Sequence, residues 1–391
     1  MGRSKQSAPK RRRIETLSND ENSQKTIEEK KEQQRAIEIL RTAPSSIVEK
    51  AAADAIRKSL PFWEDLSPDH YQPNNLTKKK SVIDFPGLGI HNQILSSDFQ
   101  TFQKLHDIIK QKTSHVQHTS WSGSLSDPRR RAFGFLPGTL GYNDQVRNHY
   151  LDISTPGVKM DDNTNDVSIH KTTTNENERR RNNLASVLLK EEDIPNGFYE
   201  AFERLLKYFQ NCIRFQNTIS VPINKDQFTI ENCENNSTDI DLSQYLTISN
   251  LVAAQPNLHC GRHLLPSHVD HPTKDGFGII ILTIAIRGGA SILLETFDQK
   301  KKGKLRLDEG QAYMLSDFVR NACTHGVLAD GSGIDETLVT EKSISLKENT
   351  NDKKDQDQSF RESLNFRFGL HGWKPNDPKP SEVLKYWGPK F

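Results

Sequence analysis

The chain has 391 residues, enough for one large domain or two ordinary ones, but only 34% of them are hydrophobic. With a mean hydropathy of -0.73, we expect a core of moderate size and long polar segments that stay unfolded. The 53 basic and 51 acidic residues leave a net charge of +2. This balance excludes a strongly basic protein, although local basic patches remain compatible with it.

Cysteine use and hydropathy indicate a soluble intracellular protein, located in the nucleus and/or the cytoplasm. The four cysteines form no C-x-x-C pair, which argues against a structural zinc site and suits a reducing compartment. The N-terminus lacks the apolar stretch of a secretory signal. The longest apolar run, 277–286, is too short to span a bilayer. We expect a monomer without a membrane contact.

The N-terminal residues 1–60 are predicted to be a disordered or helical tail. Lys10, Arg11, Arg12 and Arg13 are typical of a nuclear import signal or a nucleic-acid contact, and equally of a solvated tail. Residues 26–59 have helix-favouring composition. Residues 60–90 are rich in Pro and Lys and indicate a linker.

A single domain is predicted over residues 84–375, with two helices ahead of its strands. Apolar residues at helical spacing predict a helix over 97–112, and a second helix is predicted over 195–215. Three polar, low-complexity stretches interrupt the domain and are predicted to be disordered insertions: 155–183, 224–241 and 330–358.

Short apolar runs separated by Gly and charged turns predict a series of strands in the second half of the chain. They cover 246–254, 277–286, 290–297, 305–307, 311–316 and 364–370. Such a series favours an antiparallel double-sheet core. The predicted fold class is therefore α+β, with a double-stranded β-helix (jelly-roll) core and N-terminal helices packed on one face.

A candidate metal site lies in this strand region. His268 and Asp270 form an H-x-D pair, and residues two apart on a strand point to the same side. His325, far downstream after a predicted strand, can supply a third ligand. Two His and one carboxylate match the facial triad of non-haem Fe(II) oxygenases, which leaves positions open for a co-substrate and for O₂.

The final predicted strand carries Arg361 and Arg367. They are an even number of residues apart, so they face one side of the strand, while Leu364, Phe366 and Phe368 face the other. A guanidinium is well suited to holding a carboxylate through two parallel hydrogen bonds. The pair is therefore a candidate for binding a carboxylate co-substrate.

The order of H-x-D, a distant His and R-x(5)-R resembles the AlkB family of dioxygenases. The resemblance covers about residues 246–370 well and 97–215 loosely. It implies Fe(II) as the metal, 2-oxoglutarate as co-substrate, Arg361 on the distal carboxylate of 2-oxoglutarate, and Arg367 nearer the metal and substrate. Asn257 stands where the family has an Asn, whereas His259 and Ser363 replace its Tyr and Asn.

Upstream, Arg129–Phe135 resembles the family's substrate-lid region. Trp121, Phe133, Phe135 and Tyr142 can stack on an extruded base with Arg129–Arg131 on phosphates, or they can form an ordinary core edge beside a solvated turn. The resemblance implies oxidative demethylation of N-alkylated DNA or RNA. An oxygenase acting on protein or on a small molecule, and a catalytically inactive adaptor with this fold, remain alternatives.

Overall fold

The computed structural model describes residues 55–76, 84–114, 129–153, 185–218, 241–260, 264–270, 277–297, 299–329, 333–334 and 359–370. Most of the predicted N-terminal tail and of the three polar insertions lies outside these residues, and what was expected of them stays a prediction. Within the described ranges, no helix combines the length and the apolar character that a membrane crossing needs.

Helices and strands divide the described residues into two sheets and a helical layer. The helices are α3 (Pro73–Leu76), α4 (Ser96–Thr113), α5 (Asp144–Ile153), α7 (Phe198–Thr218) and α8 (Asp317–Asn321). The five-stranded sheet has the order β1 (Glu64–Asp65), β10 (Lys302–Leu307), β9 (Ala290–Thr296), β12 (Cys323–Ala329) and β7 (Leu264–His268). The main path of the nine-stranded sheet has the order β2 (Leu88–His91), β11 (Ala312–Leu315), β8 (Phe277–Arg287), β14 (Ser359–Gly369), β6 (Leu251–Cys260), β4 (Phe133–Phe135) and β5 (Ser186–Leu188). Off this path, β3 (Arg129–Arg131) pairs with β6, and β13 (Gly333–Ile334) pairs with β14.

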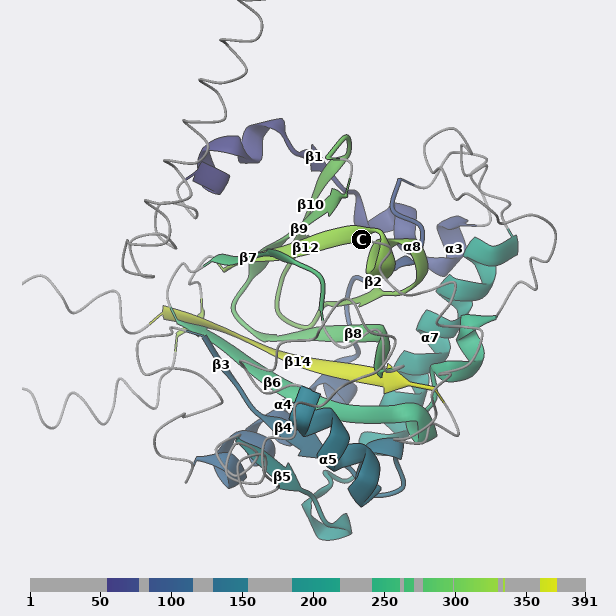
Figure 1. The fold of residues 1–391 in the computed structure, drawn as a ribbon, viewed down its shortest axis with the longest axis vertical. Coiled ribbons are helices and arrows are strands. Elements are labelled where there is room, and N and C mark those ends of the chain that lie inside the picture. The colour runs from purple at the N-terminus through teal and green to yellow at the C-terminus, as the bar shows by residue number, and fades with distance from the viewer. Residues whose placement is uncertain are drawn as a thin grey trace, which may run out of the picture. The chain divides into compact units, whose positions relative to one another are not determined.

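The strand pairing is that of a jelly roll. Eight strands pair as nested antiparallel hairpins: β6 with β14, β7 with β12, β8 with β11, and β9 with β10. The first and third of these pairs belong to the larger sheet, and the other two belong to the smaller sheet. The two sheets face each other in Figure 1. The predicted double-stranded β-helix is confirmed by this topology.

The helical layer covers the outer face of the larger sheet, where α4 and α7 lie against β8 and β14 (Figure 1). Phe102 on α4 packs edge-to-face against Phe202 on α7 and Phe366 on β14. All three rings are fully buried. Both helices fall close to their predicted ranges because one stripe of large apolar side chains recurs at helical spacing in each.

Two expectations fail. The linker predicted over 60–90 is wrong for its described residues, because Trp63 and Tyr71 are buried and β1 extends the smaller sheet beside β10. The strand predicted over 246–254 begins only at Leu251. Before it, the chain forms two 3₁₀ turns, Leu242–Tyr245 and Ile248–Asn250. An apolar run alone does not distinguish a strand from a buried turn.

The space between the two sheets is filled with apolar side chains over part of its length. Leu88, Ile292, Leu294 and Leu315 belong to this buried cluster. The inward positions on β6 and β14, together with the facing ends of β7 and β12, are polar instead. This polar section carries the candidate site.

Candidate metal and co-substrate site

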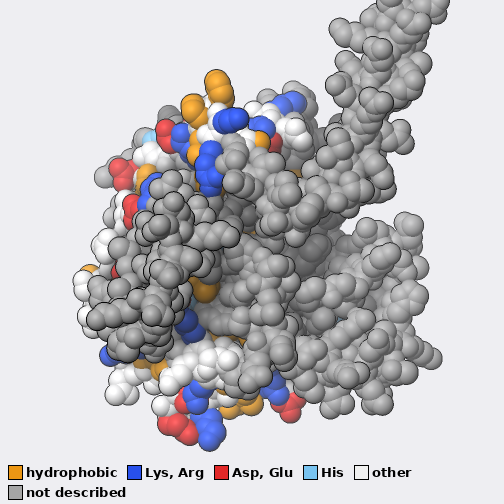
Figure 2. Space-filling view, turned by 90° about the vertical axis from the view of Figure 1, so that its left-hand side faces the viewer, with side chains coloured by type: hydrophobic (Ala, Val, Ile, Leu, Met, Phe, Trp, Pro, Cys, Tyr) orange, Lys and Arg blue, Asp and Glu red, His pale blue; other side chains and the backbone are white. Residues whose placement is uncertain are grey.

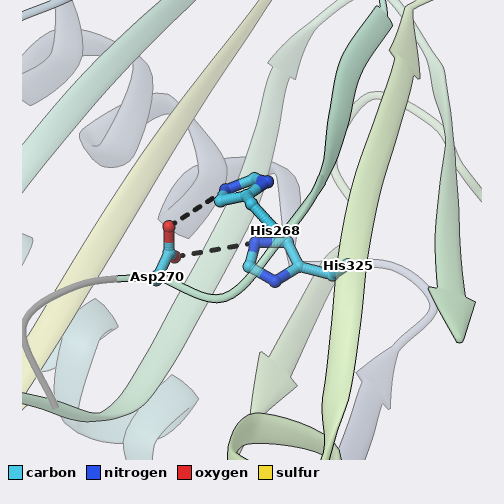
Figure 3. Close-up of side chains that lie close together, drawn as sticks. All are labelled: His268, Asp270 and His325. Atoms are coloured by element: carbon cyan, nitrogen blue, oxygen red, sulfur yellow. Dashed lines mark hydrogen bonds and ion pairs between the residues drawn. The ribbon is translucent and has the colours of Figure 1, made fainter. Parts of the chain in front are cut away.

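His268, Asp270 and His325 meet between neighbouring strands of the smaller sheet. His268 is the last residue of β7, and His325 lies directly opposite it on β12 in the antiparallel register. Asp270 stands two residues beyond the strand and turns its carboxylate toward both rings (Figure 3). A single cross-strand pair therefore joins residues 57 positions apart in the sequence, 268 to 325.

The spacing of the three side chains fits an octahedral metal. Asp270 Oδ1 lies 3.2 Å from His268 Nε2, and Asp270 Oδ2 lies 3.6 Å from His325 Nε2. Adjacent ligands of an octahedral ion with bonds of about 2.1 Å stand roughly 3 Å apart. His268 Nδ1 lies 2.7 Å from the carbonyl oxygen of Pro266. When Nδ1 donates this hydrogen bond, Nε2 keeps its lone pair for a metal.

The charges within the triad also suit cation binding. Burial alone favours the neutral acid, but the charge of Arg367 and the hydrogen bond from His268 hold the pKa of Asp270 well below its ordinary value. Burial lowers the pKa of His325 to about 3, which keeps its imidazole neutral. Burial acts in the same direction on His268, but its hydrogen bond to Asp270 outweighs this and raises the pKa. A metal at Nε2 would take the place of that proton.

Strand β14 presents Arg361, Ser363 and Arg367 to the space between the sheets. Leu364, Phe366 and Phe368 belong to the opposite, helix-covered face, so the odd-numbered residues point inward. Arg361 is only 2% exposed. Arg367 Nη2 lies 3.1 Å from Asp270 Oδ2, which connects this strand directly to the triad.

The first jelly-roll strand places Asn257 and His259 beside these arginines. In the β6–β14 register, His259 is opposite Arg361 and Asn257 is opposite Ser363. Directly opposed residues share one face of a sheet, so both point inward. Gln255 Nε2 donates to Asn257 Oδ1 at 3.0 Å, and Asn257 Nδ2 donates to the backbone carbonyl oxygen of Gln255 at 3.2 Å. Each residue that the sequence singled out for metal or co-substrate thus lies around one inter-sheet space; its chemical role stays a prediction.

Three further side chains lie near the triad and the two arginines, and the sequence did not predict them. Tyr313 on β11 is buried, which raises its pKa, and the charges of Arg361 and Arg367 act against that rise. Tyr150 on α5 acts electrostatically on Arg367. Arg320 on α8 donates to the backbone of Asp270. In the sequence, Tyr313 is one apolar residue in an apolar strand, and Tyr150 and Arg320 lie on helices whose placement no local pattern reveals.

Of the two alternatives for the aromatic residues near Arg129–Phe135, the structure favours a core position for Phe133 and Phe135. Phe133 and Phe135 on β4 are fully buried with Tyr150 and Phe277, where their rings make edge contacts with Tyr150. They therefore belong to the core, the alternative that the sequence left open. Tyr142 is partly buried at the end of a 3₁₀ turn, and Trp121 lies outside the described residues.

The arginine run itself is a strand. Arg129–Arg131 form β3, which pairs with Leu258 and its neighbours on β6, so that Arg129 is opposite His259. Arg131 lies over the Phe133 ring, 5.6 Å from its centroid. Elsewhere on the surface, Figure 2 shows basic and acidic side chains interspersed over one face of the described residues.

Comparisons with known proteins give no family assignment from sequence. No protein-family model matches the chain, and no curated protein matches it. Among solved structures, an oxidoreductase of the 2OG-Fe(II) oxygenase family from Burkholderia pseudomallei is 11% identical with a TM-score of 0.20, over 30% of this chain and 43% of that one. OsALKBH1 is 16% identical with a TM-score of 0.26, over 45% of this chain and 66% of that one. The chain thus matches less than two thirds of the length of either structure. Similarities of this size carry no argument, and the fold assignment rests on the strand order.

Proposed function

We propose that the protein is an Fe(II)- and 2-oxoglutarate-dependent dioxygenase. One observation carries the proposal: a two-His, one-carboxylate triad lies between the two sheets together with the buried, inward-facing Arg361. A bound Fe(II) would supply O₂ activation coupled to oxidative decarboxylation of 2-oxoglutarate, giving succinate, CO₂ and a hydroxylated substrate. The remaining steps belong to the side chains that bind and orient the reactants.

In this proposal each group has a separate task. His268 Nε2, His325 Nε2 and a carboxylate oxygen of Asp270 would hold the metal on one face. Arg361 would bind the distal carboxylate of 2-oxoglutarate through two parallel hydrogen bonds, with the Tyr313 hydroxyl as an additional donor beside it. Arg367 holds the second oxygen of Asp270 and so fixes the orientation of that carboxylate.

For the oxidised substrate, we propose an N-alkylated DNA or RNA. Support comes from the sequence of β3, three consecutive arginines on a strand that pairs with β6, with Arg129 opposite His259 in the register. Arginine is well suited to contacts with a phosphate backbone. Hydroxylation of an N-linked methyl carbon gives a hemiaminal, which releases formaldehyde and leaves the free amine.

A protein or small-molecule substrate is the second candidate, because burial of Phe133 and Phe135 removes two of the aromatic rings expected to stack on a base. Succinate production with a panel of methylated DNA, RNA and peptides separates the two. Turnover on nucleic acid that declines in Arg131→Ala supports the first candidate. Turnover confined to peptides or small molecules supports the second.

The metal site is tested independently of any substrate by Mn²⁺ binding, because Mn²⁺ replaces Fe(II) without being oxidised during the measurement. His268→Ala, Asp270→Ala and His325→Ala should each abolish high-affinity Mn²⁺ binding and 2-oxoglutarate turnover while the chain stays folded. His70→Ala is the matched control, because this exposed histidine lies on a 3₁₀ turn outside the triad. His371, which directly follows the last described residue of the chain in the sequence, is another histidine downstream of Asp270. If His325→Ala remains active and His371→Ala is inactive, the third ligand is wrongly assigned. A folded wild-type chain without Asp270-dependent Mn²⁺ binding would indicate an inactive adaptor instead.

A further inference from the structure

Arg320 is a buried arginine whose partners are two backbone carbonyls beside the triad. It lies on α8 and is 2% exposed. Its Nε donates to the carbonyl oxygen of Gly278 at 2.8 Å, and its Nη2 donates to that of Asp270 at 2.7 Å. These two carbonyls stand on either side of residues 271–276, which connect Asp270 to β8. The guanidinium therefore fastens together both ends of the segment that follows the metal-site carboxylate.

The helix that carries Arg320 is itself firmly seated. Ser316, just before α8, donates to the carbonyl oxygen of Gly87 through both its backbone N–H and its hydroxyl. A Cβ at Gly87 would lie 1.9 Å from the Ser316 carbonyl oxygen, so the two segments are in the closest contact that glycine permits. Gln216 on α7 in turn accepts from the N–H of Gly87 and donates to the carbonyl oxygen of Leu88. Arg320 thus projects toward Asp270 from an element that is anchored on the opposite side.

Burial of the Arg320 cation is unfavourable, and it lowers the pKa of Arg320 to about 10. Arg367 lies close by: a Cβ on Gly278, whose φ is +64°, would stand 3.5 Å from Arg367 Nη1 and 3.7 Å from Arg320 Nη2. A neutral donor would satisfy a carbonyl without bringing two like charges together. The planar fork of a guanidinium, however, reaches two separate carbonyls with fixed geometry.

We propose that Arg320 is a positioning residue for the metal site: by holding the carbonyls of Asp270 and Gly278, it sets the place and direction of the Asp270 carboxylate. Asp270 needs such support because it stands beyond the end of β7, outside the ladder that holds His268 and His325 opposite each other. Arg367 fixes the Asp270 side chain, and Arg320 fixes its backbone. This inference rests on the proposed function, since it assumes that Asp270 is a ligand.

The test compares Arg320→Met and Arg320→Lys with the wild-type chain, using Mn²⁺ affinity and the visible spectrum of the Co²⁺-loaded protein. Arg204→Met is the matched control, because Arg204 also makes two hydrogen bonds, to Asp98, but on the outer helical layer. Loss of a group that orients a metal ligand typically weakens metal binding 10–100-fold. We expect a weakening of about that size in Arg320→Met, with a changed Co²⁺ spectrum, and a smaller loss in Arg320→Lys. Arg204→Met should leave both measurements unchanged.

A folded Arg320→Met protein with wild-type Mn²⁺ affinity and an unaltered Co²⁺ spectrum overturns the inference, even if its unfolding midpoint is lower, because a purely structural role predicts that combination. If Arg320→Met does not fold, Arg320→Lys decides by the same criteria, since it retains the charge but not the fork. Wild-type protein lacking Asp270-dependent Mn²⁺ binding overturns the proposed function, and this inference with it.

Discussion

Removing Arg361 should damage co-substrate binding far more than metal binding. The side chain is buried on β14, opposite His259 in the strand register and on the same inward face as Arg367. Deleting one partner of a buried, hydrogen-bonded charge pair costs about 3–5 kcal/mol, because the other charge is left in a dry site. At about 1.4 kcal/mol per tenfold, this corresponds to a loss of 2-oxoglutarate affinity of about a hundredfold to a few thousandfold.

The assay is a titration of Mn²⁺-loaded protein with 2-oxoglutarate, followed by measurement of KM and kcat with Fe(II). Arg361→Ala should raise the Kd and KM for 2-oxoglutarate steeply and leave Mn²⁺ affinity nearly unchanged. Arg361→Lys should recover only part of the loss, since an ammonium cannot form the two parallel bonds of a guanidinium. Arg367→Ala should instead lower kcat and Mn²⁺ affinity, because Arg367 contacts Asp270 at 3.1 Å. An unchanged KM in Arg361→Ala, combined with a raised KM in Arg367→Ala, would reverse the two roles. Unchanged values in both variants would remove the co-substrate assignment altogether.

Three further predictions concern stability, measured as the free energy of unfolding in denaturant. Phe135→Ala should cost about 3–5 kcal/mol, because the ring is fully buried. Leu188→Ala on the neighbouring strand should cost far less, because Leu188 is 42% exposed. Equal losses would contradict the assignment of Phe135 to the core. Burial raises the pKa of Asp317 to about 6. The Asp317 carboxyl therefore binds its proton more tightly in the folded state than in the unfolded state. As a result, wild-type stability falls as the pH rises from about 4 to 6. Asp317→Asn should therefore be more stable than wild type by about 2–3 kcal/mol above pH 6 and equal to it near pH 4; a pH-independent difference would refute the cause. Glu362→Gln should cost about 1.5–3 kcal/mol, since the buried Glu362 carboxylate accepts a hydrogen bond from Lys110 Nζ at 2.7 Å and also pairs with Arg287. An Arg287→Met change should then cost less in the Glu362→Gln background than in the wild-type chain.

Much of the framework could be predicted because it depends on local periodicity. The β8 strand was found from one isoleucine-rich run, and α4 and α7 were found from their apolar stripes. The inward direction of Arg361 and Arg367 followed from alternation along a strand, since the residues between them had to face a core. The same reasoning placed His268 and Asp270 on one side, although only His268 lies on the strand.

What could not be predicted depends on contacts between distant segments. Trp63 and Tyr71 lie in a stretch whose composition is that of a linker, yet both are buried, and β1 nearby adds to the edge of the smaller sheet. Phe133 and Phe135 look equally suited to stacking on a base or to filling a core, and the position of α5 decides between the two. Arg320 carries no local signal at all, because its importance comes from the backbone carbonyls that it reaches across the fold.

Nested pairing explains why residues so far apart in the chain can form one site. The first strand pairs with the last, β6 with β14, and the second pairs with the second to last, β7 with β12. Asn257 and His259 therefore meet Ser363 and Arg361, and His268 meets His325, whatever length of chain connects the strands. Each doubling of a flexible connection adds only about 0.6 kcal/mol to the cost of closing it. A long polar stretch such as 335–358 can thus lie between the strand of His325 and the strand of Arg361 without moving either one, because the register of the ladders, rather than the connection, fixes the position of both.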